Sequence, residues 1–428
     1  MKFYYKIFSS VFILVIIQAN ANIIDLDIVY NNKIYNDSIY TTQLHINGDP
    51  LSYPIINLNS ETKIKLSFDD FHSELQEYYY TIIHCDASWR NSQLMQSEYI
   101  DGFFEQKIED YEFSFNTLKT YTHYSLIFPN ENLKPIISGN YIIAVYKNNN
   151  LNDIVFTKRF MILENKVNIE ASINRSMIIE ERNYKQQVKF SINHNNLVIS
   201  NPYSDIKVLI KQNNRNDNYI TNLIPEFVKK DKLVYNFLDN NIFYGNNEFR
   251  NFDIKSIRYQ SERIQSINSD SNLIYVNLFT DISRSFDEYF SHPDLNGNFF
   301  IKKQEAWNSD IEAEYVNVYF SLLENREISY ADIYIIGRFT DWNIDPKYKL
   351  KYNSEKRRYE VSIFLKQGYY NYAYILKNKT DNKTSSSFIE GTHYESNNDY
   401  YIYVYHRENG SSYDQLIGYY KTKSDSLF

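Results

Sequence analysis

The sequence predicts an all-β protein built from tandem β-sandwich domains. Apolar and polar residues alternate in several short stretches, the pattern of strands with one face toward a core and one toward water. The chain holds 42 Tyr and 28 Phe but only 10 Gly and 8 Pro, and aromatic residues favour strands. Frequent asparagine-rich turn signals separate these stretches, a spacing typical of sandwiches and not of alternating βαβ units.

Six stretches carry the clearest strand signal. Alternating side chains predict half-buried strands at 64–68, 188–192 and 359–363. Three further runs are apolar on both faces, which predicts strands covered on both sides, at 141–146, 273–278 and 333–336.

Helical signal is poor. Residues 70–78 could form two turns with Phe71, Leu75 and Tyr78 on one face, and residues 102–110 are a weaker candidate. No stretch sustains a 3.6-residue period over the length of an ordinary helix. We therefore expect strands joined by turns, with little helix.

Changes in the sequence pattern divide the chain into five expected segments. A charged start, an apolar core too short to span a bilayer and an Ala-Asn-Ala signal predict a secretory signal peptide over residues 1–21, cleaved after Ala21. We expect an N-terminal β-sandwich domain over 22–165, a middle β domain over 166–310 and a C-terminal β-sandwich over 311–410. The segment 244–271 is assigned to the middle domain as a long connection. Residues 411–428 are expected to be a polar, disordered tail.

Charge and cysteine content narrow the class of partner. The formal net charge is −8, and it becomes −10 once Lys2 and Lys6 leave with the signal peptide. An acidic chain without a basic tract argues against nucleic acid and anionic lipid. The single cysteine, Cys85, excludes an intramolecular disulfide. No second apolar run reaches the length of a membrane-spanning helix, so we expect an exported, soluble protein without a transmembrane segment in the mature chain.

The most chemically suggestive cluster is His84-Cys85-Asp86. A thiolate and an imidazole can bind zinc, but structural zinc sites need about four ligands, and no CxxC or HxxxH pattern stands nearby. Adjacent residues on a strand also point to opposite faces. The pattern favours a buried, structural cysteine.

Acidic residues offer two further possibilities, and both favour structural roles. The pairs Asp69-Asp70 and Glu180-Glu181 could serve a glycosidase only if their carboxylates were held across a sugar, and solvated turns explain them better. Residues 294–298 resemble part of a calcium loop, but Gly297 stands at the fourth position instead of the sixth. We expect a hairpin turn there. No sequence fingerprint of an enzyme or of a cofactor site occurs.

The third region carries an aromatic turn. Residues 337–343 read Gly-Arg-Phe-Thr-Asp-Trp-Asn and are followed by a tyrosine-rich stretch at 368–372. This pattern resembles the early-set immunoglobulin-like domains of glycogen- and starch-binding modules. Aromatic faces stack on sugar rings, so an exported glycan-binding β-sandwich protein is the alternative function. We favour the interpretation that Phe339 and Trp342 anchor the sandwich core.

One ordered set of motifs supports a more specific resemblance. In chain order the set is His84-Cys85-Asp86-Ala87-Ser88-Trp89, Glu98-Tyr99-Ile100-Asp101-Gly102-Phe103, Tyr121-Thr122-His123-Tyr124, Phe128-Pro129-Asn130 and Ser138-Gly139-Asn140-Tyr141. Together these motifs resemble the plug protein family of the type IX secretion system, a Bacteroidota family formerly classed as a domain of unknown function. Residues 337–343 and 365–372 resemble the C-terminal part of that family, and the similarity is weak between Asn174 and Asn308.

The resemblance implies a periplasmic protein that is peripherally associated with the outer-membrane translocon. Its partner would be the large β-barrel translocon of the type IX system, whose periplasmic opening the protein would bind and occlude. The resemblance supplies no catalytic residue, metal or cofactor. Phe339, Trp342 and Asn343 are the candidate interface residues, and Trp89 is expected to pack the first sandwich. The acidic charge suggests electrostatic steering toward the partner.

Overall fold

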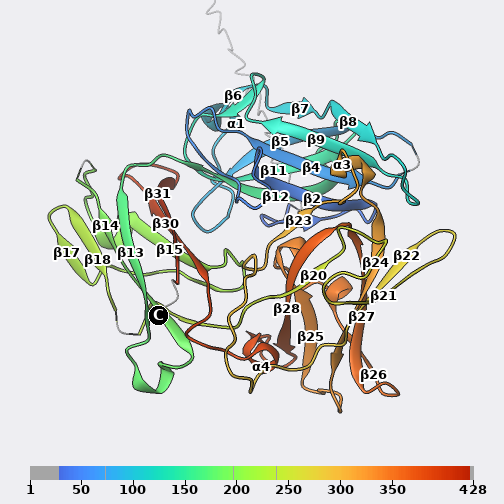
Figure 1. Ribbon diagram of the computed structural model, residues 1–428. Helices are drawn as coiled ribbons and strands as arrows, with labels where there is room; N and C mark the ends of the chain where they lie inside the picture. Colours follow the sequence, from blue (N-terminus) through green and yellow to red (C-terminus); the bar gives the residue numbers. More distant parts are fainter. Residues whose placement is uncertain (1–27, 73, 196, 238, 425–428) are drawn as a thin grey trace, which may run out of the picture.

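The computed structural model describes residues 28–72, 74–195, 197–237 and 239–424, so the predicted signal peptide lies outside the described residues (Figure 1). Within these ranges the chain forms mostly antiparallel sheets that pack as three sandwiches. The predicted all-β class is confirmed. In Figure 1 the first sandwich, in blue and cyan, lies above the other two, which stand side by side.

The first sandwich encloses its core between two sheets. One sheet has the order β1-β12-β11-β5-β7 with β3 parallel to β12, and the other has the order β2-β4-β9-β8. Rings from both sheets meet in the core, where the centroid of Phe68 on β4 lies 4.9 Å from that of Phe156 on β12. The elements are β1 (Lys33–Ile34), β2 (Ile39–Ile46), β3 (Ile55–Asn57), β4 (Ile64–Asp70), β5 (Tyr78–Cys85), α1 (Gln96–Tyr99), β6 (Ile100–Gly102), β7 (Glu105–Lys107), β8 (Asp110–Phe113), β9 (Thr122–Phe128), β10 (Leu133–Pro135), β11 (Gly139–Lys147) and β12 (Ile154–Leu163).

The middle sandwich combines strands from two distant parts of the chain. One sheet has the order β13-β14-β18-β17 with β19 on β14, and the other has the order β16-β15-β30-β31. Phe243 on β19 contacts Tyr400 on β30 at 5.4 Å between ring centroids, which joins the two sheets in one core. The elements are β13 (Asn168–Arg175), η1 (Ile179–Glu181), β14 (Lys185–Asn193), α2 (Pro202–Asp205), β15 (Ile206–Gln212), β16 (Tyr219–Ile220), β17 (Phe227–Lys229), β18 (Lys232–Tyr235), β19 (Ile242–Tyr244), β30 (Asp399–His406) and β31 (Gln415–Lys423).

The third sandwich is built around the long strand β28. β28 pairs with β20, β23, β25 and β29, and this sheet packs on the sheet β21-β22-β24-β27-β26. Phe320 on β24 lies 5.1 Å from Tyr372 on β28, measured between ring centroids. The elements are β20 (Arg250–Asp253), β21 (Ile264–Ser269), β22 (Ile274–Leu278), β23 (Phe299–Ile301), α3 (Ser309–Glu312), β24 (Tyr315–Leu323), β25 (Ala331–Ile336), η2 (Arg338–Thr340), η3 (Pro346–Tyr348), β26 (Lys351–Asn353), β27 (Arg358–Lys366), β28 (Gly368–Asn378), β29 (Thr384–Ser385) and α4 (Ser387–Glu390).

Sheet membership does not follow the expected boundaries at 310 and 410. The segment 244–271, interpreted as a connection in the middle domain, contributes β20 and β21 to the third sandwich. Conversely, β30 returns to the middle sandwich, where Val404 lies opposite Val208 on β15. The sequence does not reveal which distant strands pair. The alternation of apolar and polar residues in a strand indicates which face is buried but does not identify the neighbouring strand.

Both short candidate helices are wrong. β4 runs to Asp70 and β5 begins at Tyr78, and the described residues between them form no helix. Phe71 packs edge-on against Tyr315 of the third sandwich, with ring centroids 4.9 Å apart. The segment 102–110 is occupied mainly by the ends of β6 and β8 and by β7. Tertiary contacts override the weak local helical pattern in these segments.

The interpretation of residues 411–428 as a tail also needs correction, because Gln415–Lys423 form β31. Residues 425–428 lie outside the described residues. Leu416 and Ile417 are fully buried, and Gly418 packs closely against Val167, the residue before β13: a Cβ at Gly418 would lie 2.6 Å from Val167 Cγ2. The polar composition of this segment hid a strand whose buried residues are few. The C-terminal strand is therefore part of the middle core.

Candidate functional site

The first and third sandwiches are joined by an ion pair withdrawn from water. Lys366 Nζ on β27 lies 2.5 Å from Asp69 Oδ2 on β4, and each side chain is only 1% exposed. Asp69 also accepts hydrogen bonds from Tyr315 Oη at 2.6 Å and interacts with His123 Nδ1 at 2.6 Å. Burial alone would raise the pKa of Asp69, but the Lys366 ammonium and His123 hold it below its ordinary value. Asp69 is therefore a structural anchor, and its interpretation as a solvated turn residue is wrong.

The aromatic turn at 337–343 forms a second connection between the same two sandwiches. Asp341 and Trp342 adopt left-handed backbone angles, with φ of 52° and 59°. This conformation directs Asp341 to Lys158 on β12, whose Nζ lies 2.7 Å from Oδ2. Asn343 Nδ2 donates to the Asn32 carbonyl at 2.9 Å. The turn thus docks the third sandwich onto the N-terminal strands.

The three candidate interface residues lie in or beside this junction. Trp342 is 5% exposed and packs with Phe249, and Phe339 packs against the core of the third sandwich, 5.5 Å from Tyr370 between ring centroids. Whether a partner meets Phe339, Trp342 or Asn343 stays a prediction. Stacking on a sugar requires an accessible ring, and the Trp342 ring is buried. Trp342 therefore gives no support to the alternative glycan-binding function.

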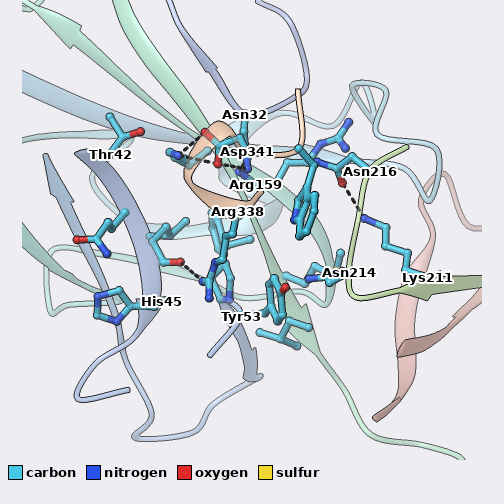
Figure 2. Close-up of a pocket in the computed structure, with 18 of the residues that line it drawn as sticks. Asn32, Thr42, His45, Tyr53, Arg159, Lys211, Asn214, Asn216, Arg338 and Asp341 are labelled. Carbon is cyan, nitrogen blue, oxygen red and sulfur yellow. Dashed lines mark hydrogen bonds and ion pairs between the residues drawn. The ribbon is translucent and has the colours of Figure 1, made fainter. Parts of the chain in front are cut away.

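A cavity of ≈ 90 Å³ lies where all three sandwiches meet (Figure 2). The first sandwich contributes Arg159 and Tyr53, the middle sandwich contributes Lys211, and the third contributes Arg338 and Asp341. Arg338 donates to the Ser52 carbonyl at 2.5 Å and lies over the Tyr53 ring, 4.5 Å from its centroid. These residues are far apart in sequence, so no motif marks the cavity.

The cluster His84-Cys85-Asp86 is structural. Cys85 is a buried free thiol, and burial raises its pKa to about 12, which leaves it protonated and unreactive. His84 is also buried, and burial lowers its pKa to about 4. Trp89 packs in a cluster shared with Tyr401 and Tyr403 of β30, so it joins the first and middle sandwiches and does not fill the core of the first alone.

The other acidic motifs also have structural partners. Glu181 pairs with Lys185, and their atoms are 2.5 Å apart. Asp294 accepts hydrogen bonds from the backbone amides of Phe249 and Asn296, and burial raises its pKa to about 6. Asn296-Gly297 forms a turn, but β23 beyond it pairs with β28, so the expected hairpin is wrong. Within the described ranges no group of three or more His, Cys, Asp or Glu is arranged to hold a metal ion.

A buried charge network that the sequence did not reveal lies inside the third sandwich. Arg250 on β20 contacts Asp281 at 2.8 Å and Glu390 of α4 at 3.0 Å. Tyr372 and Tyr374 on β28 both donate to Asp281. Every member is buried, so this network holds β20, β28 and α4 together and offers no open site.

An exposed aromatic surface lies at the edge of the first sandwich. β8 ends its sheet and presents Tyr111 and Phe113, and Phe113 is 62% exposed. Trp307, fully exposed, precedes α3 beside the same edge, where Asn308 Nδ2 donates to Glu112 at 3.2 Å. We call Tyr111, Phe113, Phe115 and Trp307 the aromatic edge. Figure 1 shows β8 and α3 next to each other at the upper right of the molecule. Exposed apolar clusters of this kind mark interaction surfaces.

The comparisons with known proteins identify the family. Residues 39–164 match the first domain of the type 9 secretion system plug protein, and these residues span β2 to β12. A solved structure of a hypothetical protein from Parabacteroides merdae is 34% identical, with a TM-score of 0.89, and the match covers 92% of this chain and 100% of that one. The chain belongs to the type IX secretion system plug protein family.

Membership in the plug family implies a periplasmic component of the secretion system. No curated protein matches the chain. The matched first domain of the plug family carries most of the aromatic edge, while Trp307 comes from the segment before α3. In the part of the chain that the structure describes, no helix is both long and apolar enough to cross a membrane.

Proposed function

We propose that this plug-family protein binds the periplasmic opening of the outer-membrane translocon barrel of the type IX system and occludes it. The observation that carries the proposal is the match of the first sandwich to the plug domain, together with the aromatic edge exposed on that sandwich. Outer-membrane barrels reach about 36 strands, and a barrel of that size encloses an aqueous pore that needs closure when no substrate crosses.

The fastening of the three sandwiches supports a role as a stopper. The first and third sandwiches share several ion pairs, among them Asp69 with Lys366, Lys158 with Asp341 and Lys65 with Asp310. The first and middle sandwiches share the cluster of Trp89 and the β30 tyrosines, and the Glu164 amide donates to the Leu416 carbonyl of β31 at 2.9 Å. Paired buried charges favour one arrangement, because breaking a pair would leave a buried charge without its partner. The body can therefore close a pore as one unit.

The aromatic edge is the surface that we propose meets the barrel. Among the described strands none pairs with the outer side of β8. An exposed strand edge with large apolar side chains favours association with another protein. Acidic Glu109, Asp110 and Glu112 flank the rings, so the complementary surface on the translocon is expected to be basic.

Capture of the translocon from the cell envelope tests the proposal. The tagged protein should co-purify with the large barrel, and replacing Phe113 and Trp307 together by Ser should reduce recovery at least about tenfold because interface aromatics commonly carry ~2 kcal/mol each. Phe286→Ser is the matched control, because this ring is as fully exposed as Trp307. Its loop lies beside α4, at the opposite end of the third sandwich (Figure 1).

A deletion strain supplies the second readout. Loss of the protein should let large antibiotics leak through the outer membrane, and the Phe113/Trp307 variant should fail to restore the barrier. The proposal is wrong if no barrel co-purifies and the deletion strain shows no leakage. If the barrel is recovered equally well with the double variant, the translocon binds a different surface.

A further inference from the structure

The cavity between the three sandwiches has an unusual excess of positive charge. Its lining contains Lys158, Arg159, Lys211 and Arg338, and the only carboxylate among the lining residues is Asp341. Asp341 is already engaged by Lys158, with both carboxylate oxygens within 3 Å of Nζ. Three cations therefore face the cavity region without a carboxylate of their own.

None of these three cations forms a salt bridge within the described chain; each contacts neutral groups instead. Lys211 Nζ donates to Asn216 Oδ1 at 2.9 Å (Figure 2). Arg159 donates to the Tyr30 carbonyl and lies over the Trp89 ring. Arg338 donates to backbone carbonyls, including that of Ser52. Buried charges in proteins are normally paired, because burying an unpaired ion costs several kcal/mol.

Lys211 shows this cost most clearly. Lys211 lies on β15 and lines the cavity between the three sandwiches, and the residue is only 6% exposed. Burial and the neighbouring Arg159 guanidinium lower its pKa to about 7, and Asp217, which is bound to Arg215, offsets only part of that effect. An anion beside Lys211 would restore the charged form.

Neutral hydrogen-bond donors around the cavity also indicate a missing acceptor. The indole Nε1–H groups of Trp89 and Trp342 are both buried and have no acceptor among the described residues, and both side chains line this cavity. Unsatisfied buried donors are rare in native proteins and call for an explanation. Cations and unpaired N–H groups gathered around one space call for an acceptor with several oxygens.

We propose that this cavity binds a small oxyanion held jointly by Arg159, Lys211 and Arg338, one from each sandwich. The volume of ≈ 90 Å³ admits a group of the size of sulfate, phosphate or a short carboxylate, and it is well below the roughly 300 Å³ of pockets for larger ligands. Guanidinium groups match oxyanions through paired hydrogen bonds. An anion in this position bridges all three sandwiches and locks their relative arrangement.

Thermal unfolding of the full chain tests this proposal. Millimolar sodium sulfate should raise the melting temperature by about 1–3 °C over sodium chloride at the same ionic strength, because a ligand that binds only the folded state stabilises it. Phosphate and acetate, tested in the same way, distinguish inorganic anions from carboxylates as the preferred source of the oxyanion.

Three variants separate specific binding from a general salt effect. Lys211→Met should abolish the sulfate increment without lowering the melting temperature in chloride, because a buried cation is replaced by an apolar side chain of similar length. Lys230→Met, at an exposed position of the same sandwich, should keep the increment. Trp342→Phe keeps an aromatic ring but removes the indole N–H together with part of the ring volume, and it should weaken sulfate binding several-fold in titration calorimetry.

Two results would overturn the proposal. One is an equal effect of sulfate and chloride on the wild-type protein. The other is a sulfate increment that persists in Lys211→Met, since sulfate also stabilises proteins through exclusion from their surface. Neither result bears on translocon binding, which is measured separately.

Discussion

At the residue scale, the burial of the Asp69 carboxylate depends on the Lys366 ammonium. The carboxylate is buried, and the Lys366 ammonium, the Tyr315 hydroxyl and His123 compensate its lost hydration. Lys366→Met should lower the free energy of unfolding by about 3–5 kcal/mol, because it leaves Asp69 ionised and deprived of its ammonium partner. The midpoint of denaturant-induced unfolding measures this change.

The double variant Asp69→Asn/Lys366→Met is the control for that experiment. It removes both charges, so it should recover most of the stability lost in Lys366→Met. Equal destabilisation of the single and double variants would show that the charge pair is not what the site requires.

The sequence predicted the roles of some residues and not of others, and the difference lies in how far apart the contacting residues are in the sequence. The burial of Cys85 followed from its strand context and from the lack of nearby ligands, and the structure confirms it. The role of Asp69 could not be inferred, because Lys366 and Tyr315 are remote in sequence and adjacent in space. The cavity was missed for the same reason: Arg159, Lys211 and Arg338 carry no shared motif.

At the element scale, strands with a strong alternating or doubly apolar pattern were predictable. The stretches around 64–68, 188–192 and 359–363 lie in β4, β14 and β27. Their expected inward positions are buried, except that Val361 is only partly buried. The prediction was wrong for segments whose conformation depends on residues that are distant in the sequence. β31 is an example, because its burial depends on β30 and on Val167.

The contribution of β31 to stability can be measured directly. Ile417→Ala should lower the free energy of unfolding by about 2–5 kcal/mol, because Ile417 is fully buried in the core of the middle sandwich. Lys423→Ala, at an exposed position of the same strand, should change it by less than about 0.5 kcal/mol. A disordered tail would give the same small effect for both substitutions, and that outcome would contradict the strand.

At the scale of the whole molecule, the chain closes on itself. It builds the first sandwich, begins the middle one, completes the third, and then returns through β30 and β31 to complete the middle one (Figure 1). The middle sandwich therefore cannot form fully until the C-terminal strands are available. This topology, with the ion pairs across the junction, makes the three sandwiches one body suited to docking as a unit.

The charge of this protein leads to a prediction about its rate of association with the proposed partner, the translocon barrel. The chain is acidic overall, with a formal net charge of −8, and Glu109, Asp110 and Glu112 flank the aromatic edge. Opposite charges on two partners accelerate their encounter, and salt screens this attraction. The association rate constant with purified translocon should fall about tenfold or more between roughly 20 and 300 mM salt, while the dissociation rate changes much less.

Surface plasmon resonance measures both rates, and replacing the three acids by Gln or Asn should flatten the salt dependence. Equal association rates at low and high salt would rule out electrostatic steering and leave the aromatic contacts as the main source of recognition.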